Sequence, residues 1–127
     1  MPTLFVMSAF PEPRQSDDDV ICALDHLVVV LQEISRRNEE AVQRALTVRE
    51  LYAQGLSYRD IATREEHPRI IELTRTNLDA LLDAGGRLRR TEARTLHDQG
   101  LTMEQIAELH GVTRQRVSAL LRSPLSA

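Results

Sequence analysis

Apolar residues recur at alternating spacings of four and three through the first half of the chain. The row consists of Val20, Leu24, Leu27, Leu31, Ile34, Ala41, Ala45, Val48 and Tyr52, with the one polar residue Asn38 between Ile34 and Ala41. A heptad pattern of this length predicts one long amphipathic helix from about residue 17 to about residue 54. Ser16 or Asp17 is expected to cap it, because acids in the first turn favour the helix dipole. Residues 1–16 lack a helical period, and we predict a flexible arm there.

The predicted helix is long for a domain of this size, which indicates a use beyond internal packing. We predict that the first part of this helix forms the interface of a homodimer. The interface residues would be Val20, Leu24, Leu27, Leu31, Ile34 and Asn38. The part around Ala41 and Ala45 predicts close packing on the rest of the chain. Alternatively, the whole row packs on later helices of the same chain, since Ile21, Val28 and Val30 widen it.

An internal repeat follows. The segments "RELYAQGLSYRDIA" (49–62) and "RTLHDQGLTMEQIA" (94–107) match at an offset of 45. In each segment a glycine, Gly55 or Gly100, can end a helix in the left-handed conformation. A hydroxyl residue, Ser57 or Thr102, then caps the next helix, and Thr102 with Gln105 has the pattern of a capping box. The repeat therefore predicts a helix, a tight corner and a second helix at both places.

The two copies diverge after residue 62. In the first copy Pro68 begins a longer helix to about Ala84, and Gly85 with Gly86 is predicted to stop that helix and form a hinge. In the second copy Gly111 supplies another turn. We therefore predict an all-α fold, in which a long N-terminal helix precedes two helix-turn-helix-like repeats. Residues 17–86 would form a dimerising scaffold and residues 87–127 a DNA-binding domain.

The last two predicted helices have an apolar side that faces inward and a polar side that faces outward. The residues expected to point inward are Ile106, Ala107, Val112, Val117 and Leu120, and this pattern is typical of two helices that cross at a steep angle. Arginine can bind the O6/N7 edge of guanine, glutamine the N6/N7 edge of adenine, and threonine and serine suit phosphate. The outward residues of this kind are Thr113, Arg114, Gln115, Arg116, Ser118 and Arg122.

The segment "LTMEQIAELHGVTRQRVSALL" resembles the DNA-binding fourth conserved region of bacterial sigma factors, where a similar "GVSRQRV" run opens the recognition helix. The resemblance covers about 30–35 of the 127 residues. It implies that this helix reads a promoter element, that Arg114, Gln115, Arg116 and Ser118 contact bases or phosphates, and that Thr113 caps the helix. His110 stands where the family usually has an apolar residue, so the corner is expected to pack differently.

Nothing in the chain resembles the sigma regions that melt DNA or hold the polymerase, so a complete sigma factor is not expected. The whole chain looks more like a small actinobacterial sigma-like helix-turn-helix regulator. We predict a sequence-specific, duplex-DNA-binding transcriptional regulator that acts as a homodimer. Two alternatives stay open. One is a protein-interaction module that binds RNA polymerase or a sigma factor, and the other is a low-specificity nucleoid or plasmid-partition protein.

The charge distribution bears on these alternatives. The net charge is −3, and all 16 basic residues are arginines. Residues 85–127 carry +3 and residues 1–84 carry −6, so the acidity lies outside the predicted DNA-binding domain. Arg89 and Arg90 of the "RLRR" run, together with Thr102, complete the predicted DNA contacts. The first copy is predicted to be a scaffold, with an alternative in which Arg64, Arg69 and Arg75 contact phosphate.

Residue patterns of other chemistries are missing from the sequence. The four histidines and Cys22 have no metal-ligand spacing, and there is no phosphate-binding glycine loop or nucleophile elbow. We therefore expect no catalytic residues, no metal and no cofactor. A lone Cys22 fits the reducing cytoplasm, and the most apolar stretch, "ICALDHLVVVL", is too short for a membrane span. The expected location is cytoplasmic, in association with the nucleoid.

Overall fold

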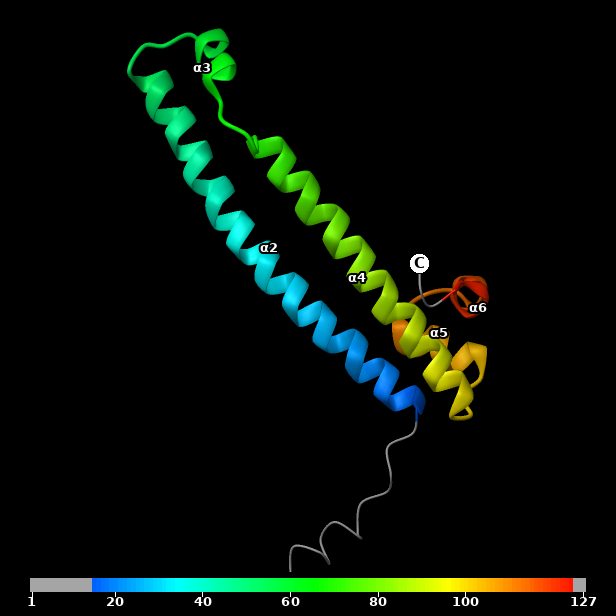
Figure 1. The fold of residues 1–127 in the computed structure, drawn as a ribbon. Coiled ribbons are helices and arrows are strands. Elements are labelled where there is room, and N and C mark those ends of the chain that lie inside the picture. The colour runs from blue at the N-terminus through cyan, green and yellow to red at the C-terminus, as the bar shows by residue number, and fades with distance from the viewer. Residues whose placement is uncertain (1–14, 125–127) are drawn as a thin grey trace, which may run out of the picture. The chain divides into compact units, whose positions relative to one another are not determined.

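The computed structural model describes residues 15–124, and over this range every regular element is a helix (Figure 1). The elements are α2 (Gln15–Ala53), α3 (Tyr58–Arg64), α4 (Ile70–Asp98), α5 (Met103–His110) and α6 (Arg114–Arg122). The all-α prediction is therefore confirmed. Within the described range, no helix has the length and apolar character needed to cross a membrane.

The start of the long helix differs slightly from the prediction. Residues 1–14 of the predicted arm lie outside the described residues, and Gln15 and Ser16 are already helical. The predicted cap at Ser16 or Asp17 is therefore wrong by about two residues, a common uncertainty at a helix end. Asp17 and Asp18 lie in the first turn, where their charges favour the helix dipole.

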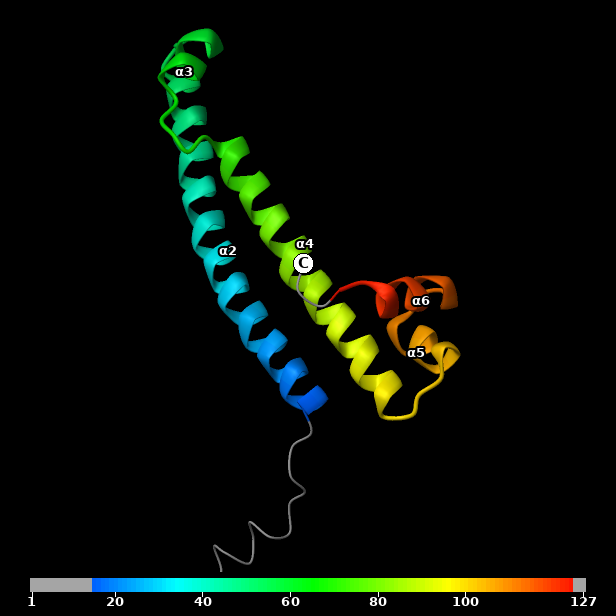
Figure 2. The same cartoon turned by 45° about the vertical axis from the view of Figure 1, so that its right-hand side comes forward.

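The chain divides into two compact units. The hairpin unit comprises His26–Gly86, and the C-terminal unit comprises the residues up to Asp25 together with those from Arg87 onward. Within the hairpin unit, α2 and α4 lie side by side and run antiparallel, and α3 lies in the connection between them (Figures 1 and 2).

Small residues carry much of the packing inside the hairpin unit. Its buried apolar residues are Ala41, Ile61, Leu73 and Ala84. Burial of Ala41 agrees with the close packing predicted for this part of α2, since a methyl side chain lets two helices approach closely. Between the helices, Asn77 of α4 donates a 2.7 Å hydrogen bond to the Oδ1 atom of Asn38. This polar pair fixes how far the two helices slide along each other.

The predicted hinge at Gly85 and Gly86 is wrong. Helix α4 continues through both glycines without interruption, and neither has a positive φ. A glycine inside a helix costs about 1 kcal/mol relative to alanine, which is a small fraction of what a packed helix of this length gains. Ala84, directly before the pair, is almost fully buried and helps to hold the segment in the helix.

The two predicted glycine corners are confirmed and have the same backbone geometry. Gly55 has a φ of +99° and Gly100 a φ of +103°. In each corner the next residue donates its N–H to the carbonyl five residues earlier, at 3.2 Å for Leu56 and 3.0 Å for Leu101. This is the hydrogen bond that closes a Schellman motif.

The helix after each corner is capped as the sequence predicts. The Ser57 hydroxyl accepts a 3.2 Å hydrogen bond from the N–H of Asp60. At the second corner Thr102 and Gln105 form the complete capping box, in which each side chain accepts from the other residue's N–H, at 3.1 and 2.8 Å. The local signals for helix ends therefore gave the correct structure at both corners.

Candidate nucleic-acid interface

Helices α5 and α6 pack on a small apolar core inside the C-terminal unit. Ile106 and Val117 are fully buried, and Ala93 from α4 lies in the same cluster. Ala107 and Leu120 complete it, so the predicted inward positions are confirmed, with Val112 partly buried at the edge. This core fixes α6 firmly on α5.

The turn between α5 and α6 is set by Gly111 and Thr113. Gly111 has φ +66° and ψ +34°, the left-handed conformation that the sequence predicts. The N–H of the next residue, Val112, donates to the carbonyl of Ala107 at 3.0 Å. Thr113 caps α6, because its hydroxyl accepts a 3.1 Å hydrogen bond from the N–H of Arg116.

The exposed side of α6 brings together most of the predicted DNA-binding residues. An α-helix turns by about 100° per residue, so Arg114, Ser118 and Arg122 share one row and Gln115 lies beside it. Ser118 is partly buried and the other three are exposed. A hollow of about 230 Å³ lies at this surface, lined by Met103, Arg114, Gln115 and Ser118. We call Arg114, Gln115, Ser118 and Arg122 the α6 face.

Arg116 lies apart from the α6 face. It is exposed, but two residues turn the helix by about 200°, so it projects about 160° away from Arg114. The structure therefore divides the predicted contacts of α6 into one group of four and one separate arginine. A single groove wall cannot be contacted equally by both sides of a helix.

An ion pair that the sequence pattern did not predict lies beside the α6 face. The Arg114 Nε atom is 3.0 Å from the Glu104 Oε1 atom of α5, and the two side chains are 65% and 67% exposed. Ion pairs this exposed contribute about 1 kcal/mol or less, so another hydrogen-bond acceptor can replace the carboxylate at small cost. No spacing rule pointed to this pair, since its members belong to different helices.

Arg94 of α4 holds the end of α6. Its guanidinium donates hydrogen bonds to the carbonyls of Leu121 at 2.7 Å and Ser123 at 3.2 Å. These carbonyls belong to the unsatisfied end of a helix, where a cation is favourable. Arg94 could not be singled out from the sequence, because its partners are backbone atoms that leave no trace there.

The remaining residues predicted to contact DNA differ in how exposed they are. Arg89 is exposed, whereas Arg90 is partly buried and its Nε atom has no hydrogen-bond partner in the structure. Thr102 is exposed at the start of α5, where its hydroxyl serves the capping box. Arg89 and Thr102 are thus accessible to a ligand, and Arg90 is accessible only in part.

His110 lies at the corner between α5 and α6. Its side chain is only 13% exposed, and its Nε2 atom lies 3.4 Å from the Glu92 Oε2 atom of α4 without the geometry of a hydrogen bond. Its neighbour Leu109 is exposed. The corner therefore places an imidazole towards α4 and a leucine towards solvent.

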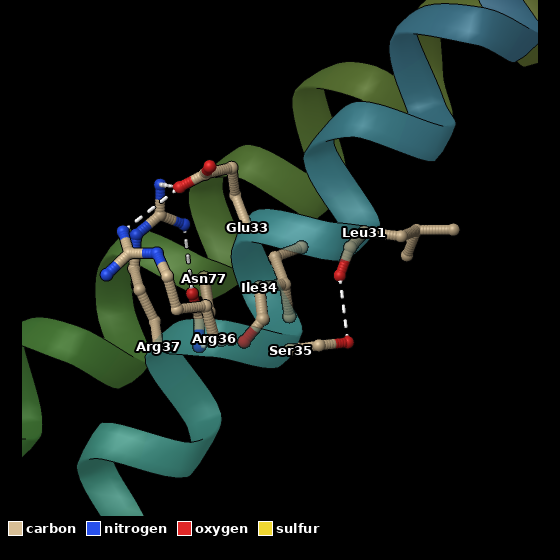
Figure 3. Close-up of polar contacts among 7 residues, drawn as sticks. All are labelled: Leu31, Glu33, Ile34, Ser35, Arg36, Arg37 and Asn77. Carbon is tan, nitrogen blue, oxygen red and sulfur yellow. Dashed lines mark hydrogen bonds and ion pairs between the residues drawn. The ribbon is translucent and has the colours of Figure 1, made fainter.

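The residues of the predicted dimer interface are also divided. Val20, Leu27 and Ile34 are partly buried, whereas Leu24 and Leu31 are exposed. Asn38 is exposed but pairs with Asn77 of its own chain. Figure 3 shows Asn77 of α4 on the side of α2 to which the Arg37 side chain points. Arg37 donates a 3.1 Å hydrogen bond to the Oδ1 atom of Asn77.

Comparisons with known proteins add no relative. No protein-family profile, no curated protein and no solved structure matches the chain.

Proposed function

We propose that the chain binds duplex DNA through the α6 face and regulates transcription. The supporting observation is the division of α6 into two sides. One side carries Val117, which is fully buried, and the other presents the four polar residues of the α6 face. A short helix held rigidly by one side, with hydrogen-bond donors on the other, is the arrangement by which helix-turn-helix proteins read the major groove.

The side chains of the α6 face match the chemistry of base edges. The guanidinium groups of Arg114 and Arg122 can each donate two hydrogen bonds to guanine O6 and N7. The Gln115 amide can donate and accept at adenine N6 and N7. Ser118 is shorter and suits a phosphate oxygen or a thymine. In this proposal Arg114 exchanges Glu104 for a base, which the exposure of that ion pair allows.

Phosphate contacts would come from groups around the α6 face. The hydroxyls of Thr102 and Thr113 accept capping hydrogen bonds and keep their own O–H to donate. Arg89, Arg90 and Arg116 would supply further positive charge from the same C-terminal unit. Residues 85–127 carry +3, which favours approach to a polyanion. Contacts of this kind position a protein on DNA without reading its sequence.

The resemblance to the fourth region of sigma factors supports the same use of α6. If the chain is a homodimer, two such helices would bind an inverted repeat, with half-sites one helical turn or a multiple apart. A cytoplasmic, nucleoid-associated location follows from this proposal.

A second candidate function is binding to RNA polymerase or to a sigma factor. Two observations favour it. Glu104 places a negative charge beside the α6 face, and residues 1–84 carry −6. A protein partner with a basic surface would fit such a chain. A nucleoid or partition protein is a third candidate, in which the same arginines contact only phosphates.

Selection of bound sequences from random duplex DNA by the full chain tests these candidates. The proposal predicts enrichment of a defined sequence, and an affinity that falls steeply with salt, by about 0.9 logarithmic units per neutralised phosphate and per tenfold salt. Retention of DNA without an enriched sequence would instead indicate the nucleoid function. Absence of any complex at low salt would contradict DNA binding and favour the protein-interaction module.

A further inference from the structure

The hairpin unit exposes more large apolar side chains than it buries. Its buried apolar residues include two alanines, with Ile61 and Leu73 as the large ones. Apart from Val29, which projects to the other side of α2, eight large aliphatic side chains from its two long helices are 43–71% exposed. We call them the hairpin face, and they are Val28, Leu31, Val42 and Leu46 on α2 and Ile71, Leu78, Leu81 and Leu82 on α4.

Helix geometry places both halves of the hairpin face on one side of the hairpin. On α2 the row is rotated by about 120° from the buried Ala41, and on α4 by a similar angle from the buried Leu73 and Ala84, in the same sense. Since the two helices run antiparallel, equal rotations bring the rows to the same side. Figure 3 shows Leu31 and Ser35 on the side of α2 away from Asn77.

The hydroxyl residues that interrupt the two rows are already satisfied. Ser35, on the α2 row, donates to the carbonyl of Leu31 at 3.0 Å. Thr74, on the α4 row, donates to the carbonyl of Ile71 at 2.9 Å. A hydroxyl that donates within its own helix can be covered by an apolar surface at little cost. The rows are therefore suited to burial along their whole length.

We propose that the hairpin face binds a second copy of this chain, so that two hairpins form an antiparallel four-helix bundle. Each of the eight side chains is 43–71% exposed, so together they leave several hundred Å² of apolar surface in solvent, on the order of the roughly 800 Å² that a stable interface buries on each partner. Two antiparallel rows, over residues 28–46 of α2 and 71–82 of α4, make a two-helix surface, and a two-fold rotation provides the matching surface.

Charges at the edge of the hairpin face complement each other under this symmetry. Glu39 borders the α2 row and Arg75 borders the α4 row, and both are exposed. The Asn38–Asn77 pair shows that residues 39 and 75 lie at about the same level along the hairpin. With a two-fold axis parallel to the helices, Glu39 comes opposite the partner's Arg75. A second copy therefore fits the edge as well as the apolar centre.

This interface differs from the row that the sequence predicts. Of the predicted residues within the hairpin unit, Leu27 and Ile34 are partly buried, and only Leu31 belongs to the hairpin face. The new interface is rotated around α2 and takes half of its residues from α4. It does not depend on DNA binding.

Sedimentation equilibrium of the full chain without DNA tests the interface with a matched pair of variants. Val28 and Val29 are adjacent and similarly exposed, at 51% and 57%, but only Val28 lies on the hairpin face. We expect a dimer whose dissociation constant rises at least about 100-fold in Val28→Asp, because the interface would bury two unpaired carboxylates. Val29→Asp should change the dissociation constant of the dimer by no more than about twofold.

Leu82→Asp on α4 provides a second variant, with the same expected rise in the dissociation constant. Circular dichroism must show unchanged helix content in each variant, and Leu82→Asp decides the test if Val28→Asp does not fold. A wild-type chain that stays monomeric at all concentrations would overturn the proposal, whether another protein or residues 1–14 of the chain cover the face. So would a dimer that survives the substitutions at Val28 and Leu82.

Discussion

The two glycine corners of this chain share one backbone geometry but lead to different surroundings. Gly55 and Gly100 have nearly the same φ, and both are followed by a hydroxyl-capped helix. After the first corner, α3 buries only Ile61, and hollows lie against this residue. After the second corner, α5 joins α6 around a continuous core. Hydrogen bonds between near neighbours thus fix a corner, but packing decides whether it becomes part of a two-helix unit.

Truncation of the buried isoleucine after each corner is the strongest test of this difference. Ile106→Ala should cost about 2–5 kcal/mol of unfolding free energy, because it empties the centre of a closed core. Ile61→Ala should lie at the low end of that range, since its surroundings are already incompletely filled. Urea denaturation followed by circular dichroism measures both values. A larger loss for Ile61 would show that the first corner has the tighter core.

Substitution of the corner glycines by alanine tests the left-handed backbone conformation that the two corners share. A methyl group at either position meets no atom within 4 Å, so only the left-handed backbone is strained. Gly55→Ala and Gly100→Ala should therefore each cost about 1–2 kcal/mol. The same denaturation experiment should give values that agree closely. Clearly unequal losses would mean that the corners are not equivalent in solution.

Removal of the capping hydroxyls should have the smallest effect. Ser57→Ala and Thr102→Ala should each cost about 1 kcal/mol of unfolding free energy. Thr102 should be the more costly, because only its cap is reciprocal: the Thr102 N–H also donates to the Gln105 Oε1 atom, and loss of the hydroxyl weakens the whole capping box. Serine at position 102, as Thr102→Ser, keeps the hydroxyl and serves as the control. Equal stability of wild type and Thr102→Ala would contradict the importance of the capping box.

The features that sequence predicts correctly here are those that depend on neighbouring residues. Helix ends at Gly55, Gly100 and Gly111 were predictable because a positive φ favours glycine. The buried positions of α5 and α6 were predictable from their periodicity. Both signals lie within a few residues of the structure that they describe.

The features that sequence did not predict depend on contacts between distant residues. Gly85 and Gly86 look like a hinge in the sequence, but α4 continues through them because packing outweighs their low helix propensity. Arg94 and the Arg114–Glu104 pair act between separate helices. The long heptad row was a correct signal for α2, but periodicity alone could not say which edge of the row faces the chain's own α4.

The most direct test of DNA binding compares one arginine of α6, in the region after the second corner, with one arginine of α3, after the first corner. Arg114 lies on the α6 face, and Arg59 is an exposed arginine of α3. With a selected duplex and fluorescence anisotropy, Arg114→Ala should weaken binding by about 1–3 kcal/mol, which is about 5- to 150-fold. Arg59→Ala should change the affinity by no more than about twofold. Equal effects of the two substitutions, or no effect of Arg114→Ala, would contradict recognition of DNA by α6.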